Sequence, residues 1–270
     1  MSTPAFGTPV NDVLLNYTLH LADNALILGQ RNAEWCGHGP VLEEDIALAN
    51  MSLDLIGQAR LLYQYAATVQ GGGATEDKLA YFRGPDAFRN YVLLELPHST
   101  AFAPSAQVER DYAVTICRNF LYSSLMIAVW DQLQQSSDAQ LAAIAAKSIK
   151  EVRYHLRHST DWMLRLGDGT TDSNQRLQSA LNHLMPYTQE FWTGSAMEQA
   201  AHAAGIAPDM AAGRANWLGA VQDVVAHAML RLPAAGGYIT QGKAGHHSEH
   251  LSYLLAEMQV LARAHPQATW

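Results

Sequence analysis

The chain has 270 residues, of which 49% are hydrophobic and 16% charged, a composition typical of one globular domain with an ample core. Its formal net charge is −8 and it contains no run of lysines and arginines, which argues against binding through nucleic-acid phosphates. The N-terminal residues lack the basic and apolar regions of an export signal, and apolar stretches such as Leu125–Trp130 are too short to cross a membrane.

Apolar residues recur with a helical period along most of the chain, and strand-like alternation is nearly absent. A first helix is predicted from Asn11–Asp12 to about Glu34, with one face formed by Leu14, Thr18, Leu21, Ala25 and Leu28. A second helix is predicted over 42–69, with Ile46, Ala49, Leu53 and Ile56 on one stripe. Shorter helical pieces follow over 76–97. The remaining predicted helices cover 104–136, beginning at Pro104–Ser105, then 138–166, 172–192 with a bend at Pro186, 195–204, 208–231 and 246–264.

Long helices joined by short or interrupted links are typical of an antiparallel four-helix bundle. We therefore expect an all-α fold in which shorter helices surround such a bundle. With no repeat, low-complexity tract or linker in the sequence, residues 11–270 are expected to form a single helical domain after a flexible N-terminal extension, residues 1–10. Cys36 and Cys117 are far apart and outside any C-x-x-C pattern, which fits two reduced thiols in a soluble cytoplasmic protein without membrane partners.

The stretch K-E-V-R-Y-H-L-R-H, residues 150–158, is similar to half of a di-metal site. In ferritin-like di-iron bundles two helices each supply a lone carboxylate and the other two each supply Glu-x-x-His. That motif occurs once, at Glu95–His98, where Pro97 breaks the helix that the geometry requires. His155 has Val152 three residues before it, so we expect Glu151 and His155 to form a hydrogen-bonded pair at a helix seam rather than to bind metal.

Several segments resemble one known family. They are R-N-A-E-W-C-G-H-G-P (31–40), L-A-N-M-S-L-D-L-I-G-Q-A-R (48–60), A-A-K-S-I-K-E-V-R-Y-H-L-R (145–157) and H-S-E-H-L-S-Y-L-L-A-E-M-Q (247–259). They resemble the C subunit of bacterial ring-1,2-phenylacetyl-CoA epoxidase, a multicomponent oxygenase of aerobic phenylacetate breakdown, and the resemblance extends from about residue 12 to Trp270. It implies a ferritin-like, non-catalytic subunit without metal or cofactor. Such a subunit binds and stabilises a homologous catalytic A subunit, which carries the di-iron centre, together with other subunits of the complex.

The resemblance also implies that the metal-ligand positions have degenerated. These positions are Asn24, Asp54, Gly57, Ser123, Val152 and His155. Only Asp54 and His155 could still ligate a metal, and two such groups cannot neutralise two irons. We expect polar side chains to close a network in the vacated centre, drawn from Asn24, Asp54, Gln58, Lys147, Lys150, Glu151 and His155. Removing one partner of such a buried network costs roughly 3–5 kcal/mol.

The segment Phe82–Asn90 combines two arginines with two aromatic residues. This pattern fits ordinary packing with solvated charges. It also fits a site for a CoA ester, because arginine binds phosphate and stacks on flat rings. The resemblance implies contacts to phenylacetyl-CoA from Ala87, Phe88, Arg89 and Asn90, with a lesser contribution from Gln199, Ala200 and Ala201.

Residues His246–His250 match H-x-x-E-H, the inverted zincin motif. A peptidase of that kind needs a further ligand well downstream, and only 20 residues follow His250. The glycines just before the motif indicate a helix N-terminus, so capping and surface polar contacts are favoured. A role at a partner interface comes second, and a zinc site last.

Two alternatives to the non-catalytic subunit stay open at this point. One is a di-iron or mononuclear oxygenase with atypical ligands drawn from Asp54, Glu151 and His155; the other is a free-standing helical scaffold. We also expect a homodimer when the partner subunit is missing, because a bundle face that meets a homologue can accept a copy of itself.

Overall fold

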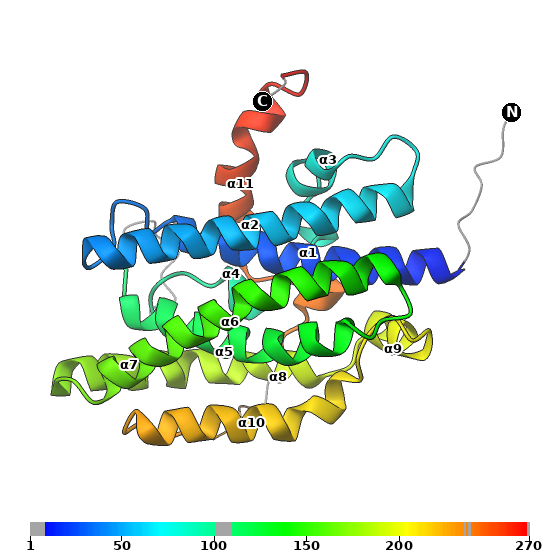
Figure 1. The fold of residues 1–270 in the computed structure, drawn as a ribbon. Coiled ribbons are helices and arrows are strands. Elements are labelled where there is room, and N and C mark those ends of the chain that lie inside the picture. Colours follow the sequence, from blue (N-terminus) through cyan, green and yellow to red (C-terminus); the bar gives the residue numbers. More distant parts are fainter. Residues whose placement is uncertain (1–8, 101–109, 235, 237–238, 269–270) are drawn as a thin grey trace, which may run out of the picture.

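The computed structural model describes residues 9–100, 110–234, 236 and 239–268, and the regular structure within them is helical (Figure 1). Four long helices form an antiparallel bundle: α1 Pro9–Ala33, α2 Leu42–Gln70, α5 Tyr112–Leu133 and α6 Ala139–Gly167. Helix α1 packs along α2, α5 packs along α6, and α2 lies beside α6. The prediction of an all-α, ferritin-like bundle is confirmed.

Shorter elements surround the bundle. They are α3 Glu76–Tyr81, η1 Pro85–Ala87, α4 Val92–Glu95, α7 Thr171–Leu184, η2 Met185–Thr188, α8 Gln189–Trp192, α9 Ala196–Ala203, α10 Met210–His227, η3 Gly242–Ala244 and α11 Glu249–Ala264. The predicted bend at Pro186 is the 3₁₀ turn η2, since proline cannot donate the hydrogen bond that a continuous α-helix needs there. Helix α11 projects away from the bundle and contacts α3, α4 and η1 (Figure 1).

Several predicted boundaries differ from the observed ones. Helix α5 begins at Tyr112, where the Asp111 carboxylate accepts a hydrogen bond from the Ala113 amide, and the expected start at Pro104–Ser105 lies outside the described residues. Helix α10 ends at His227 rather than at residue 231. Helix α11 begins at Glu249 rather than at residue 246, because Gly245 ends the preceding turn in a left-handed conformation.

The flexible extension predicted for residues 1–10 falls largely outside the described residues. Residues 1–8 are not described, and Pro9 and Val10 belong to the first turn of α1.

The predicted apolar face is buried on α1 but exposed on α2. On α1 the predicted face is buried throughout: Leu14, Thr18, Leu21, Ala25 and Leu28. On α2 the predicted stripe exists but points outward, with Ile46 52%, Leu53 66% and Ile56 37% exposed. The core of α2 is formed instead by the opposite side of the helix: Leu48, Met51, Leu55 and Leu62. Periodicity identifies an apolar stripe, but two apolar stripes on one helix leave open which of them is covered.

Helix α5 is the core helix of the molecule. Among the described residues, it is the helix whose length and composition would allow it to cross a membrane, yet 83% of its most apolar 18-residue segment is buried inside the protein. Its Cys117 thiol is buried, and this burial raises the pKa of the thiol to about 12. Cys36 is exposed, and both cysteines are free, as expected.

Candidate functional site

A polar seam joins α2 to α6 where the degenerate metal positions were expected. The Nε2–H of His155 donates to the Asp54 carboxylate at 3.0 Å, and one turn away the Gln58 amide donates to Glu151 at 2.8 Å. The predicted pairing of Glu151 with His155 is therefore wrong, because each of them bonds to α2 instead. His155 is almost fully buried, but the Asp54 side chain is 37% exposed, so this pair lies at the edge of the bundle.

The other members of the expected network are placed elsewhere. The buried Asn24 accepts a hydrogen bond from the Tyr91 amide at 2.8 Å and does not belong to the seam. Lys147 and Lys150 are exposed and make no ion pair among the described residues. The expected network therefore forms only in part: Asn24 bonds elsewhere, and the two lysines fall on the outer side of α6.

The remaining degenerate positions offer no ligand atoms that converge. Ser123 and Val152 are buried in the bundle, and a Cβ added at Gly57 would meet nothing within 4 Å. Across the parts of the chain that the structure describes, no group of three or more His, Cys, Asp or Glu side chains could hold a metal ion. Two irons require several anionic oxygens, so the donor set does not fit a di-iron centre. The oxygenase alternative has no assembled ligand set, since Asp54 and Glu151 bond to different partners.

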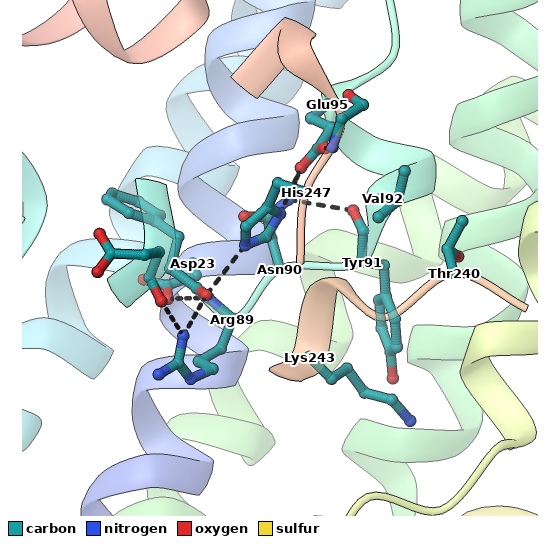
Figure 2. A network of polar contacts seen from close by, with 12 residues as sticks. Asp23, Arg89, Asn90, Tyr91, Val92, Glu95, Thr240, Lys243 and His247 are labelled. Atoms are coloured by element: carbon teal, nitrogen blue, oxygen red, sulfur yellow. Dashed lines mark hydrogen bonds and ion pairs between the residues drawn. The ribbon is translucent and has the colours of Figure 1, made fainter. Parts of the chain in front are cut away.

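A second polar cluster lies deeper, between α1 and the segment before α4 (Figure 2). The fully buried Asp23 of α1 accepts hydrogen bonds from the Tyr63 hydroxyl at 2.5 Å, from the Arg89 amide at 2.8 Å and from the Arg83 guanidinium. Burial alone would lower the pKa of Arg83, but the charge of Asp23 outweighs this effect and raises it. The Arg83 guanidinium also stacks 4.3 Å from the centre of the Phe88 ring.

Glu95 is the centre of the next group of contacts. Its carboxylate accepts from the ring of His247 at 2.8 Å, from the Asn90 amide at 2.8 Å and from the Ser248 backbone amide at 2.6 Å (Figure 2). These contacts attach the start of α11 to α4. His246 precedes α11 whereas His250 lies on it, so the i, i+4 helical spacing that suggested a zinc site is not formed. Ser248 is the N-cap residue, but its side chain makes no capping hydrogen bond.

Lys243 completes the cluster on the side of α9. Its ammonium group bonds to the Glu198 carboxylate at 2.6 Å and lies 5.6 Å from the centre of the Tyr91 ring. Its backbone amide donates to Glu190 at 2.9 Å. Burial raises the pKa of Glu190, even though hydrogen bonds from Lys243 and neighbouring groups oppose this. Both members of the Lys243–Glu198 pair are buried, and each charge has the other as its partner.

The expected CoA positions lie at the surface of this cluster and partly inside it. Phe88, Asn90 and Ala201 are buried; Ala87, Arg89 and Ala200 are half-buried; Gln199 is exposed. The Nη1 atom of Arg89 donates to the carbonyls of Asp86 and Phe88. The two segments approach each other through their neighbours, because Lys243 contacts both Tyr91 and Glu198.

Sequence reasoning missed the residues that hold this cluster together. Asp23 and Glu95 lie within apolar stretches and Lys243 lies in a glycine-containing turn, and each of the three is buried with a charged partner. Glu95 did stand out in the sequence, as a member of one failed metal motif, whereas His247 occupies a variable position of the other, H-x-x-E-H. A carboxylate that resembles a metal ligand can equally belong to a buried ion pair, and its separation in sequence from the partner histidine gives no sign of the pairing.

Two comparisons with known proteins agree with each other. The model of the phenylacetic acid catabolic protein family matches residues 7–270. The chain is also 44% identical over 257 residues to the C subunit of the 1,2-phenylacetyl-CoA epoxidase of Escherichia coli (strain K12). That similarity covers 95% of this chain and 99% of the relative.

Proposed function

The chain belongs to the phenylacetic acid catabolic protein family, and on this premise we propose that it is the non-catalytic structural subunit of a 1,2-phenylacetyl-CoA epoxidase. The observation that carries the proposal is its similarity to the C subunit of that enzyme over nearly the full length of both chains. In this role it binds and stabilises a homologous catalytic subunit and takes part in aerobic phenylacetate degradation. The di-iron centre of the complex is proposed to lie in that partner.

The donor set of the bundle supports a role without a metal of its own. Where a di-iron protein places its ligands, this chain has a hydrogen-bonded seam between α2 and α6, with Gly57 and Val152 at two of the positions. The seam connects the helices directly through side chains. A bundle stabilised in this way does not depend on a metal to hold its helices together, which suits a subunit that supports another one.

We also propose that the cluster around Glu95 supports a contact with the CoA ester. Arg89 is the cation in the expected segment whose side chain reaches the surface, and within the described part of the chain only its Nη1 atom is engaged by carbonyl groups. Its remaining guanidinium donors suit a phosphate. Phe88 and Asn90 would act indirectly by fixing the backbone, because their side chains are buried.

Co-expression with the other epoxidase subunits of the same organism tests the proposal. We expect the tagged chain to retain the catalytic subunit, iron to follow the complex rather than the chain alone, and phenylacetyl-CoA epoxidation to fall when the chain is omitted. Stoichiometric iron in the purified chain, together with epoxidation by the chain alone, would instead support the oxygenase alternative. Failure to retain any subunit would favour a free-standing scaffold.

A further inference from the structure

The outer side of α2 carries an apolar stripe that no other described element covers. Leu42 is 72%, Ile46 52% and Leu53 66% exposed, and they recur at helical spacing along the same side of the helix. A scattered exposed leucine is ordinary, but a row of exposed apolar side chains on one helix is typical of an interaction surface.

The outer side of the neighbouring helix α6 is basic. Its exposed cations are Lys147, Lys150, Arg153, Arg157 and Arg165, and Asp161 is the exposed acid among them. None of them forms an ion pair or a hydrogen bond with another described side chain, and Arg157 and Arg165 only stack on Tyr154 and Trp162 of the same helix. This accumulation of unpaired positive charge occurs in a chain whose net charge is −8.

Helices α2 and α6 lie side by side on one side of the bundle (Figure 1). On α6, Glu151 and His158 bond to Gln58 and Glu44 of α2. Three exposed residues follow the same side of α6 at helical spacing: Lys147, Tyr154 and Arg165. These exposed residues therefore border α2. Each helix has 29 residues, so together they offer a surface roughly 40 Å long and 20 Å wide. That area, roughly 800 Å², is what one partner contributes to a standard protein–protein interface.

We propose that the outer surface of α2 and α6 is the docking surface for a different protein subunit, whose facing surface is apolar opposite α2 and acidic opposite α6. This inference rests on the proposed function, because it names the surface through which the chain joins its complex. Complementary charge would steer the encounter, and the apolar stripe would supply the buried contact.

The charge pattern argues against the other occupants. A second copy in a twofold dimer would use the same patch on both chains and bring two basic surfaces into one interface. A single phosphate ligand is bound by donors that converge, whereas these cations are spaced along some five turns of helix.

Two variants and two matched controls test the proposal in the complex. Leu53→Glu alters the apolar stripe, and Val260→Glu makes the same change at an exposed position of α11. The pair Lys147→Glu and Lys150→Glu reverses two charges on α6, and the pair Arg214→Glu and Arg231→Glu reverses two exposed charges elsewhere. All of the altered side chains are exposed, so circular dichroism and the unfolding temperature should match those of the wild type.

The measurement is the Kd for the other epoxidase subunits of the same organism. We expect both test variants to raise Kd about 10-fold or more, and both controls to change it less than about 2-fold. Higher salt should weaken wild-type binding and should affect the charge-reversal variant less.

Each contrary outcome has a distinct meaning. If the wild type binds the subunits and both test variants bind equally well, the surface assignment is wrong while the proposed function stands. If the wild type binds no subunit, the proposed function fails first. If Leu53→Glu only converts a wild-type dimer to a monomer, the surface belongs to a second copy. If charge reversal abolishes binding of phenylacetyl-CoA but spares the complex, the basic stripe of α6 is a ligand site. Either of these last two results would overturn the inference.

Discussion

His247 and Glu95 are 152 residues apart in sequence and form a buried hydrogen-bonded pair, with 2.8 Å between Nδ1 of the histidine and Oε2 of the glutamate. The other ring nitrogen, Nε2, lies 3.0 Å from the Phe88 carbonyl oxygen. Both nitrogens thus face acceptors, an arrangement that suits the doubly protonated ring. Burial alone would lower the pKa of His247, but the hydrogen bond and charge of Glu95 outweigh it and raise the pKa.

This pair predicts a pH-dependent stability. A histidine whose pKa is higher in the folded state stabilises the protein fully below its unfolded pKa of about 6.5, and the contribution is lost as the pH rises through the folded value. The free energy of unfolding of the wild type should therefore exceed that of His247→Gln by more at pH 6 than at pH 9. Urea unfolding at the two pH values measures this. An equal difference at both would contradict a charged His247.

His98 should act in the opposite sense. Burial lowers its pKa to about 4, because its ring is enclosed: Nε2–H donates to the Arg31 carbonyl oxygen, and Nδ1 accepts from the Thr115 hydroxyl. Between pH 6.5 and 4 the unfolded chain takes up this proton and the folded chain does not. Stability should fall by roughly 3 kcal/mol across this window from His98 alone.

The matched variant for this prediction is His98→Asn. It should be less stable at pH 7, since it loses hydrogen bonds, but its free energy of unfolding should fall less steeply between pH 6.5 and 4. A slope identical to that of the wild type would mean that His98 does not titrate on unfolding. Glu34, whose carboxylate lies 3.2 Å from Nε2 of His98, adds a further, coupled loss between pH 4.5 and 2, because its folded pKa is about 2 and its ordinary value is 4.5.

The Asp54–His155 pair should be worth less than a fully buried ion pair. Because Asp54 is more than one third exposed, water screens the interaction, and we expect a coupling of about 0.5–1.5 kcal/mol rather than the cost of a buried network. A double-mutant cycle of Asp54→Ala and His155→Ala, followed by urea unfolding, measures it. A coupling near zero would show that the Asp54–His155 contact adds nothing to the stability of the seam.

Two glycines should respond to alanine in opposite directions. A Cβ at Gly57 meets nothing within 4 Å, so Gly57→Ala inside α2 should raise the free energy of unfolding by about 0.5–1 kcal/mol through helix propensity. A Cβ at Gly242 would clash with the Asn90 carbonyl oxygen, so Gly242→Ala should destabilise the contact between η3 and the segment before α4. Thermal unfolding of both variants checks the prediction, and destabilisation by Gly57→Ala would contradict the open space.

Treatment with a chelator should have no effect on stability. Because the bundle is held by side-chain hydrogen bonds and apolar packing, dialysis against EDTA should leave the unfolding temperature unchanged. A lower unfolding temperature that recovers on addition of Fe(II) would reveal a metal that the seam does not explain.

The sequence by itself determined the helices and the loss of the ligand pattern. Helical periodicity depends on neighbours three and four residues away, so α2, α6 and the bend at Pro186 could be located without a structure. The missing Glu-x-x-His motifs are likewise local, and the absence of a local pattern can be read directly.

Only the tertiary structure decided which side of α2 is covered, which partners Glu151 and His155 take, and that Glu95 meets His247. These outcomes depend on contacts between residues far apart in sequence. The physical reason is that burial and pairing are set by what the other helices bring to the same place. A spacing along one helix fixes the angle of a side chain around that helix, but not the group that it meets.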